Sequence, residues 1–353
     1  MSKTTIAVLH GGRSGEHEVS LRSAASIMDG LRDVGHYEVL PVFISREGIW
    51  TLEGVRVAIL PEPGVGGLYV LEGEKAGEVI PVDVVFPVLH GTYGEDGTVQ
   101  GLLELARIPY VGAGVPGSAI GMDKILMKAG LLAAGLPVGP YLWFTVADWE
   151  ENKKQLLKQI EEELAFPCFV KPANLGSSVG ISKAYDSAQL EKAINEALQY
   201  DRRVLVEKML TGCEIECSVL GNDRPEASVP GEIIPCNDFY DYSAKYLDDN
   251  SGLEIPAKLA PETIKKVREM AVQTFIALDC AGLGRVDFFV DEKTGEMWII
   301  EINTLPGFTS ISMYPKLWEA SGISFNELLQ KLVKLALERF SQKERLKTTF
   351  DPS

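Results

Sequence analysis

The sequence lacks several features that mark large classes of protein. It has five cysteines in 353 residues, and none forms a CxxC pair. A zinc site or a CxxC redox centre is therefore not expected, and we predict reduced, mostly buried thiols. No stretch approaches the roughly 18 consecutive apolar residues of a membrane-spanning helix. The short apolar run near the start is more typical of a first strand than of a signal peptide, so we expect a cytoplasmic protein.

Positive charge is also scarce. Lysine and arginine number 34 against 50 aspartates and glutamates, which gives a net charge of −16. A field of this sign repels polyanions, and it argues against binding to nucleic acid or to an anionic membrane surface. A small anion such as ATP can still bind where a few cations cluster. A site for such an anion is therefore expected only at a local group of lysine and arginine.

The order of apolar patterns predicts the architecture. An apolar run at residues 4–9 is followed by helical spacing at 18–34, and further strand and helix patterns alternate up to about residue 115. This alternation predicts an open α/β domain with a mainly parallel sheet. A helical stretch is expected over residues 118–134. We predict an α/β protein with α+β elements and the following divisions: an N-terminal domain 1–115, a central domain 116–210, a C-terminal domain 211–345 and a tail 346–353.

A long segment in the third domain has little periodicity. Residues 237–257 combine three tyrosines, a phenylalanine and a lysine with acidic and turn-forming residues. Loops of this length in compact domains are usually lids, binding loops or linkers, and the aromatic content argues against a linker. We therefore predict a lid.

A hairpin at residues 284–303 carries the most informative polar residues. If its loop is centred on Thr294, Asp287 lies opposite Glu301 and Arg285 opposite Asn303. Strand side chains alternate, so these four polar groups share one face. The other face, predicted to be core, would contain Val286, Phe288, Val290, Trp298, Ile300 and Ile302.

The polar face of this hairpin suits a hard cation. Two carboxylates and an amide oxygen lie within cross-strand distance, and Mg²⁺ prefers about six oxygen ligands, commonly shared between protein, phosphate and water. The inference is a magnesium–nucleotide site. The alternative is a solvated face on which an arginine pairs with acids.

Phosphate groups need cations and backbone donors. Lys171 ends an apolar strand and is followed by a glycine- and serine-rich loop at residues 174–180, whose N–H groups could close over phosphate oxygens. Taken alone, such a loop is often a plain turn. Lys124 would by itself be a solvated lysine on a helix.

Five segments together resemble one known family. Residues 10–20, 90–97, 239–246, 301–304 and 307–315 are similar, in this order, to motifs of the D-alanine–D-alanine ligases, members of the ATP-grasp superfamily. The resemblance extends from about residue 4 to residue 340. It implies a three-domain ATP-grasp architecture.

The resemblance implies a reaction in two steps. ATP phosphorylates the carboxylate of a first D-alanine, and the amine of a second D-alanine then displaces phosphate, which yields a dipeptide for peptidoglycan synthesis. Two Mg²⁺ or Mn²⁺ ions and a homodimer are implied as well. The chemistry is consistent with the sequence, because phosphoryl transfer between anions needs metals and cations to offset charge.

The resemblance also assigns roles to residues. Metal binding falls to Asp287, Glu301 and Asn303. ATP binding falls to Lys124, Lys171, Gly176, Ser178, Glu207, Glu214 and Lys245. Catalytic roles fall to Glu16, Ser177, Tyr246, Arg285 and His90: Glu16 would bind the first ammonium group with Ser177 and Tyr246 linked to it, Arg285 would stabilise the transferring phosphoryl group, and His90 would lie near the first substrate. Ser312 would bind the second carboxylate.

Other interpretations stay open at this point. Without the family, Glu16 could be a helix cap or a surface acid, and His10 is better explained as a structural histidine at a strand end. A nucleotide-sensing module would need neither Glu16 nor Ser312. A dinucleotide oxidoreductase is disfavoured, because the glycine-rich turn after the first strand lacks GxGxxG spacing. Within the family, Tyr246 resembles the branch that uses D-alanine as second substrate, rather than D-lactate or D-serine.

Overall fold

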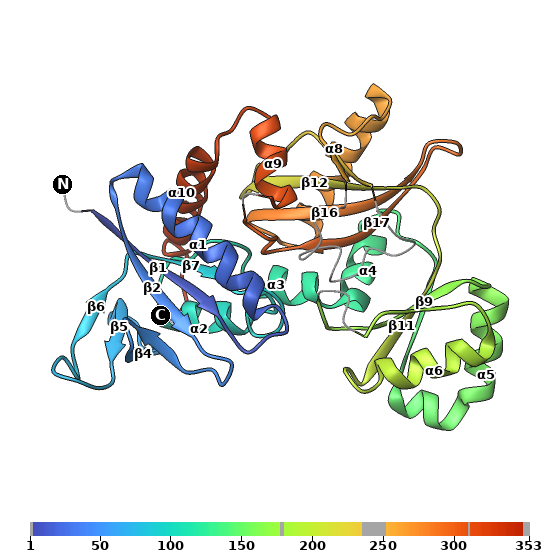
Figure 1. The fold of residues 1–353 in the computed structure, drawn as a ribbon, viewed down its shortest axis with the longest axis horizontal. Helices are drawn as coiled ribbons and strands as arrows, with labels where there is room; N and C mark the ends of the chain where they lie inside the picture. Colours follow the sequence, from blue (N-terminus) through green and yellow to red (C-terminus); the bar gives the residue numbers. More distant parts are fainter. Residues whose placement is uncertain (1–2, 177–179, 235–251, 310, 349–353) are drawn as a thin grey trace, which may run out of the picture.

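The computed structural model describes residues 3–176, 180–234, 252–309 and 311–348. Its strands form three sheets, and along the long axis of the molecule the last sheet in chain order lies between the other two (Figure 1). The first sheet has the order β6-β5-β4-β3-β2-β1-β7. Its strands are β1 (Thr4–Gly11), β2 (Tyr37–Ile44), β3 (Trp50–Leu52), β4 (Val55–Ile59), β5 (Gly67–Val70), β6 (Val79–Pro81) and β7 (Val84–Val88).

The centre of the first sheet is parallel and is covered on both faces. β1 pairs in parallel with β2 and β7, and antiparallel hairpins from β3 to β6 extend the sheet at one edge. Ile6 and Val8 pack under α1 (His17–Val34) and α10 (Phe325–Lys343), whereas Ala7 and Leu9 pack toward α2 (Thr98–Ala106). A strand buried on both faces needs a continuous apolar run. This explains why the first strand was recognisable; the antiparallel extension was not predicted.

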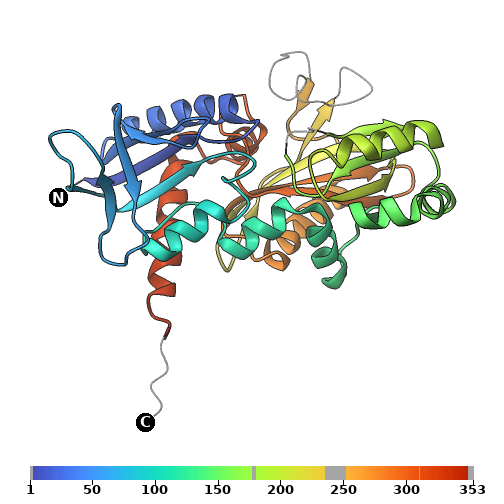
Figure 2. The ribbon, with the colours of Figure 1, turned by 90° about the horizontal axis from the view of Figure 1, so that it is seen from below.

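The second sheet is small and antiparallel. Its order is β10-β9-β11-β8, and α5 (Val146–Leu164) and α6 (Ser187–Ala197) share its core. Figure 2 shows these helices on one side of the sheet. The strands are β8 (Tyr141–Thr145), β9 (Cys168–Pro172), β10 (Ser182–Ala184) and β11 (Arg203–Lys208).

The third sheet contains the predicted hairpin. β12 pairs with β14, β13 and β16, and β16 pairs with β17. Helix α8 (Pro261–Ala277) contributes to the core on one face, and α9 (Met313–Ala320) contacts β12. The strands are β12 (Cys213–Gly221), β13 (Glu226–Ala227), β14 (Gly231–Ile234), β15 (Gly252–Glu254), β16 (Gly282–Asp291) and β17 (Glu296–Asn303).

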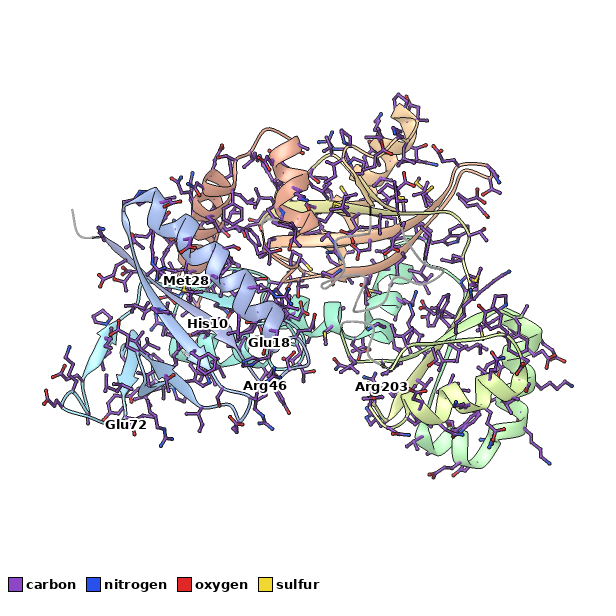
Figure 3. The ribbon with its side chains drawn as sticks, viewed as in Figure 1. His10, Glu18, Met28, Arg46, Glu72 and Arg203 are labelled. Atoms are coloured by element: carbon purple, nitrogen blue, oxygen red, sulfur yellow. The ribbon has the colours of Figure 1, made fainter. Side chains whose placement is uncertain are left out.

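The helical stretch predicted over residues 118–134 is present, but a break that was not predicted divides it. The structure has two helices there, α3 (Val115–Met122) and α4 (Lys124–Ala133), separated by Asp123 in an extended conformation. The Asp123 carboxylate accepts the N–H groups of Ile125 and Leu126, as an N-cap does, and it also pairs with Arg203 of β11, labelled in Figure 3. The break matters because it makes Lys124 the first residue of a new helix.

Helix α4 connects the second and third sheets. Met127 and Leu131 belong to the core of the third sheet, whereas Ile125 packs with Ala173 and Leu205 of the second-sheet region. The backbone N–H of Lys124 also donates to the Ala173 carbonyl. Residues at the start of α4 are therefore held where the two sheets approach each other.

The predicted core face of the hairpin is partly wrong. The pairs Asp287 with Glu301 and Arg285 with Asn303 are confirmed, but Phe288 pairs with Ile299 rather than with Ile300. Ile300 is thus the extra residue of a β-bulge, and beyond it the alternation of β17 is reversed. Met297 and Ile299 are buried in the core, whereas Trp298 and Ile300 are only half-buried.

Two predictions of absence can be compared with the structure. The four cysteines in the described ranges are free thiols, and three of them are buried; Cys236 lies outside those ranges. Within the part of the chain that the structure describes, none of the helices combines the length and the apolar content required to cross a bilayer.

Candidate active site

Three carboxylates lie side by side across the third sheet. Glu216 on β12 is in register with Asp287 on β16, which is in register with Glu301 on β17. We call these three residues the acid row. Glu216 and Asp287 are only 3% and 2% exposed, on the sheet face opposite the apolar core. Glu216 was not predicted from the sequence, because its position beside Asp287 depends on the pairing of two strands that are distant in the chain.

One guanidinium group lies against this row. Arg285 donates from Nε to Asp287 Oδ1 and from Nη2 to Asp287 Oδ2, both at 2.7 Å. Its Nε also lies 2.9 Å from Glu216 Oε2. Asn303 donates from Nδ2 to Asp287 Oδ2 at 3.0 Å. Buried charges require such pairing, yet one arginine cannot neutralise three carboxylates.

The donor set of the acid row suits a hard divalent cation. Carboxylate and amide oxygens are the ligands that Mg²⁺ and Mn²⁺ prefer, and the row keeps two net negative charges after Arg285 is counted. Across the described ranges, no three histidine, cysteine or acidic side chains converge as a ready-made metal cage. The residues therefore fit a cation whose remaining ligands come from elsewhere, as phosphate and water do for Mg²⁺.

A group of lysines surrounds one glutamate on the second sheet. Lys128 and Lys171 approach the Glu207 carboxylate at 2.6 and 2.5 Å. Burial alone would raise the pKa of Glu207, but the two lysines outweigh it and hold that pKa well below its usual range. Lys128 is 2% exposed, and it was not predicted from the sequence.

Lys124 completes this group. Its Nζ donates to the Leu175 carbonyl at 2.6 Å, so it reaches the loop that precedes Gly176. We call Lys124, Lys128, Lys171 and Glu207 the lysine cluster, and it carries two net positive charges. The solvated-helix alternative for Lys124 is wrong, since the residue is buried. Ser177 and Ser178 lie outside the described residues.

Two loops, one after β7 of the first sheet and one after β9 of the second sheet, meet at Glu16. A methyl group placed on Gly91 or on Gly176 would lie 2.6 or 2.8 Å from Glu16 Oε2. Only glycine allows backbone to approach the carboxylate this closely. Glu16 is 7% exposed and stands at the N-cap position of α1, but its side chain makes no capping hydrogen bond. The alternatives of a helix cap and a surface acid are therefore both wrong.

His90 follows β7 of the first sheet, is buried beside Glu16 and contacts the segment after β17 of the third sheet. Its Nδ1 lies 2.8 Å from the Leu305 carbonyl, which only accepts, so Nδ1 carries the proton. Its Nε2 then accepts from the Ser23 hydroxyl at 3.1 Å. Burial lowers the pKa of His90, against the opposing effects of Glu16 and the Leu305 carbonyl, and this agrees with a neutral imidazole.

Glu95 is a further acid of the site, and no role was predicted for it from the sequence. It accepts the N–H of Gly91 at 2.8 Å and that of Leu305 at 3.3 Å, so it joins the same two segments of the chain as His90. Burial, together with the Glu16 carboxylate, raises the pKa of Glu95 to about 8. The residue was visible within the motif at 90–97, but nothing in the sequence distinguished it from a surface acid.

The remaining predicted residues are distributed as follows. Glu214 on β12 has the same facing as Glu216, two positions away, and is in register with Phe289. Ser312 precedes α9, and its Oγ accepts the Thr309 N–H at 3.0 Å. His10 stays near the end of β1 and contacts Val8 and Phe43, which agrees with a structural role. Lys245, Tyr246 and most of the predicted lid lie outside the described residues.

Comparison with known proteins identifies the family. Residues 5–113 match the family described as D-ala D-ala ligase N-terminus, and residues 131–334 match D-ala D-ala ligase C-terminus. A D-alanine--D-alanine ligase of Heliobacterium modesticaldum is 53% identical over 359 residues, covering 98% of each chain.

Solved structures agree with this match. The D-alanine-D-alanine ligase of Coxiella burnetii has a TM-score of 0.86 and 37% identity, covering 98% of this chain and 97% of its own. The VanG D-Ala:D-Ser ligase of Enterococcus faecalis has a TM-score of 0.85 and 36% identity, covering 95% and 99%. The chain belongs to the D-alanine–D-alanine ligase family and has its ATP-grasp fold.

Proposed function

We propose that the protein ligates two D-alanine molecules to D-alanyl-D-alanine, with ATP converted to ADP and phosphate, and so supplies a precursor of peptidoglycan. The observation that carries this proposal is the charge pattern of the site. A lysine cluster and an acid row lie on two sheets that share α4, beside a buried glutamate where two glycine loops meet. An amino acid and a metal-bound polyphosphate need these complementary charges.

The first substrate would be held at Glu16. A buried carboxylate beside small backbone groups suits an ammonium group, and the substrate carboxylate would then point toward the transferring phosphoryl group. His90 is neutral and is fixed by its hydrogen bonds with Ser23 and Leu305, so it would position the loop with Gly91 beside the substrate. By family resemblance, Ser177 and Tyr246 extend the contact, and Ser312 binds the carboxylate of the second D-alanine.

The phosphates would be held from both sheets. Lys124, Lys171 and the loop with Gly176 and Ser178 would bind ATP phosphates, with Lys245 added when the lid closes. Glu207 and Glu214 would contact the adenine region and the ribose. Arg285 would stabilise charge on the phosphoryl group during its transfer and on the tetrahedral centre formed by attack of the second amine.

Metal ions would complete the phosphate site. Asp287, Glu301 and Asn303 would hold two Mg²⁺ or Mn²⁺ ions. When bound, such ions neutralise phosphate charge and orient the transferring group. Around them, the chain's own residues keep the acid row fixed: Arg285 and Asn303 both donate to Asp287.

The direct test measures products with each component omitted in turn. The protein is incubated with ATP, Mg²⁺ and D-alanine, and both phosphate release and D-alanyl-D-alanine are measured. We expect phosphate release only when all three are present, with one dipeptide formed for each phosphate. ATP hydrolysis without dipeptide, or phosphate release independent of D-alanine, would contradict the proposed reaction.

The second substrate needs its own assay, because a solved relative is a D-Ala:D-Ser ligase. Tyr246 resembles the branch that uses D-alanine, so D-lactate and D-serine should be poor second substrates at neutral pH. Competition of each against D-alanine, with products separated by mass, measures this preference. Mainly depsipeptide or D-alanyl-D-serine would move the protein to another branch.

Assembly and location are separate parts of the proposal. A homodimer in the cytoplasm is proposed from the family resemblance. Light scattering during size-exclusion chromatography should give twice the mass of one chain, and cell fractionation should recover the protein with the cytoplasm.

A further inference from the structure

Two partners would compete for the carboxylate oxygens of Asp287. In the structure its two carboxylate oxygens accept both hydrogen bonds from Arg285 and one from Asn303. Under the proposed function, the same oxygens bind a divalent metal. A bound Mg²⁺ requires near-ideal geometry, with oxygen ligands at roughly 2.0 to 2.1 Å. A cation at that distance repels the guanidinium, and it occupies carboxylate lone pairs that would otherwise accept hydrogen bonds from Arg285.

Arg285 has a second acidic partner on the other neighbouring strand. Glu216 Oε2 lies 2.9 Å from Arg285 Nε, and Glu216 is 3% exposed. β16 lies between β12 and β17, so Glu216 flanks Asp287 on the side away from Glu301 and Asn303. A carboxylate on that side can bind Arg285 while Asp287, Glu301 and Asn303 serve the metal.

The burial of Glu216 also needs an explanation. Placing a carboxylate in the interior is costly, and packed apolar residues are often as stable or more stable in such positions. The next residues on the opposite face of β12 are apolar and form the core. An acid at position 216 is therefore better explained by a demand of the site than by stability of the sheet.

We propose that Glu216 is a positioning residue: it holds the Arg285 guanidinium toward the phosphates when Asp287 is taken up by metal. The inference rests on the proposed function, because it takes Asp287 as a metal ligand. Without Glu216, Arg285 loses one of its two acidic partners in the acid row and competes with the metal for the oxygens of the other, Asp287. Metal binding and orientation of Arg285 should then weaken together.

The first test measures turnover. Glu216→Gln keeps the shape but removes the charge, and we expect kcat to fall about tenfold or more, in line with loss of a charge-assisted contact, with little change in KM for D-alanine. Glu226→Gln changes an exposed glutamate on β13 of the same sheet and should leave kcat unchanged. An unchanged kcat in Glu216→Gln would overturn the proposal.

The second test measures binding without catalysis. Mn²⁺ binding to the protein with ADP is followed by electron paramagnetic resonance in four proteins: the parent, Glu216→Gln, Arg285→Gln and the double variant. We expect Glu216→Gln to weaken Mn²⁺ binding several-fold in the parent, and much less in the Arg285→Gln background. Equal weakening in both backgrounds would mean that Glu216 acts directly on the metal through its charge, and would overturn the positioning role.

Two controls keep the outcome interpretable. If Glu216→Gln fails to fold, as judged by circular dichroism, Glu216→Asp replaces it, because aspartate keeps the charge but withdraws it from Arg285; we then expect an intermediate loss of kcat. Failure of the proposed function would be recognised in the parent protein, as absence of D-alanine-dependent phosphate release. The Mn²⁺ comparison does not depend on that activity.

Discussion

The lysine cluster and the acid row both contain buried charges that are only partly paired, and the excess charge has opposite signs in the two groups. In the lysine cluster, two buried or nearly buried lysines share one carboxylate, so cations are in excess. In the acid row, one arginine lies among three carboxylates, so anions are in excess. Neither group is neutral, although buried charges are normally paired.

The difference in sign indicates which counter-ion each region would bind. A surplus of cations can be completed by an anion such as a phosphate chain, and a surplus of anions by a divalent cation. A metal–nucleotide complex supplies both at once, which one free ion cannot do. The two regions should therefore respond differently to mutation: the acid row through metal and turnover, and the lysine cluster through nucleotide affinity.

The largest expected effect is on the acid row. Asp287→Asn removes one charge but keeps the shape and one acceptor oxygen, and Arg285 keeps its partner Glu216. We expect dipeptide formation to fall about 100-fold or more at saturating ATP and D-alanine, because metal and Arg285 act together on the transferring group. Steady-state phosphate release measures this loss.

The control for this variant is Asp291→Asn, at the turn end of the same strand. It should retain parental turnover, and both variants should melt within a few degrees of the parent. Near-normal turnover in Asp287→Asn would refute the assignment of Asp287 to the metal. The same reasoning applies to Glu301→Gln.

A smaller and different effect is expected in the lysine cluster. Lys171→Met leaves Glu207 paired with Lys128, so the fold should persist. Loss of one charge-assisted contact to phosphate costs about 1.5 to 3 kcal/mol, so KM for ATP should rise roughly tenfold to hundredfold. KM for D-alanine should change little.

The matched control is Lys153→Met on α5, where a half-exposed lysine pairs with Glu191. It removes the same charge from the same domain, away from the nucleotide, and should leave KM for ATP unchanged. If both variants raised KM for ATP equally, the effect would come from the net charge of the domain. The contrast between the two regions would then be lost.

The sequence predicted local pairing in this site better than long-range pairing. Arg285, Asp287, Glu301 and Asn303 lie in one hairpin, whose turn determined their register correctly near the site. The bulge at Ile300 was not predictable, because an extra residue in one strand leaves the apolar pattern ambiguous. The face assigned to Trp298 was wrong for that reason.

Glu216 and Lys128 were missed for a different reason. Glu216 becomes part of the acid row only through the pairing of β12 with β16. Lys128 can be recognised as a site residue only from its contact with Glu207. Each residue alone looks like an ordinary surface charge. Their burial and partners depend on elements that are far apart in the chain, which periodicity cannot place.

Glu95, which follows β7 of the first sheet, is a further acid of the site. It lies near two other acids, Glu16 and Glu301, so the anionic side of the site continues beyond the third sheet. In the protein without nucleotide or metal, burial and the nearby Glu16 carboxylate raise the pKa of Glu95 to about 8. The folded protein therefore holds a proton that the unfolded chain releases near its ordinary pKa of 4.5.

The sign of the resulting pH dependence follows from linkage. Between about pH 5 and pH 8 the folded state binds more protons at Glu95 than the unfolded state, so this residue lowers stability as pH rises. Glu95→Gln resembles the protonated side chain and removes that dependence. We expect its melting temperature to gain a few degrees relative to the parent between pH 5 and pH 8, whereas Glu38→Gln, an exposed glutamate on β2, should show no such trend. Parallel melting curves for Glu95→Gln and the parent would mean that Glu95 is already ionised in the folded protein, and that the anionic side of the site tolerates one more full charge.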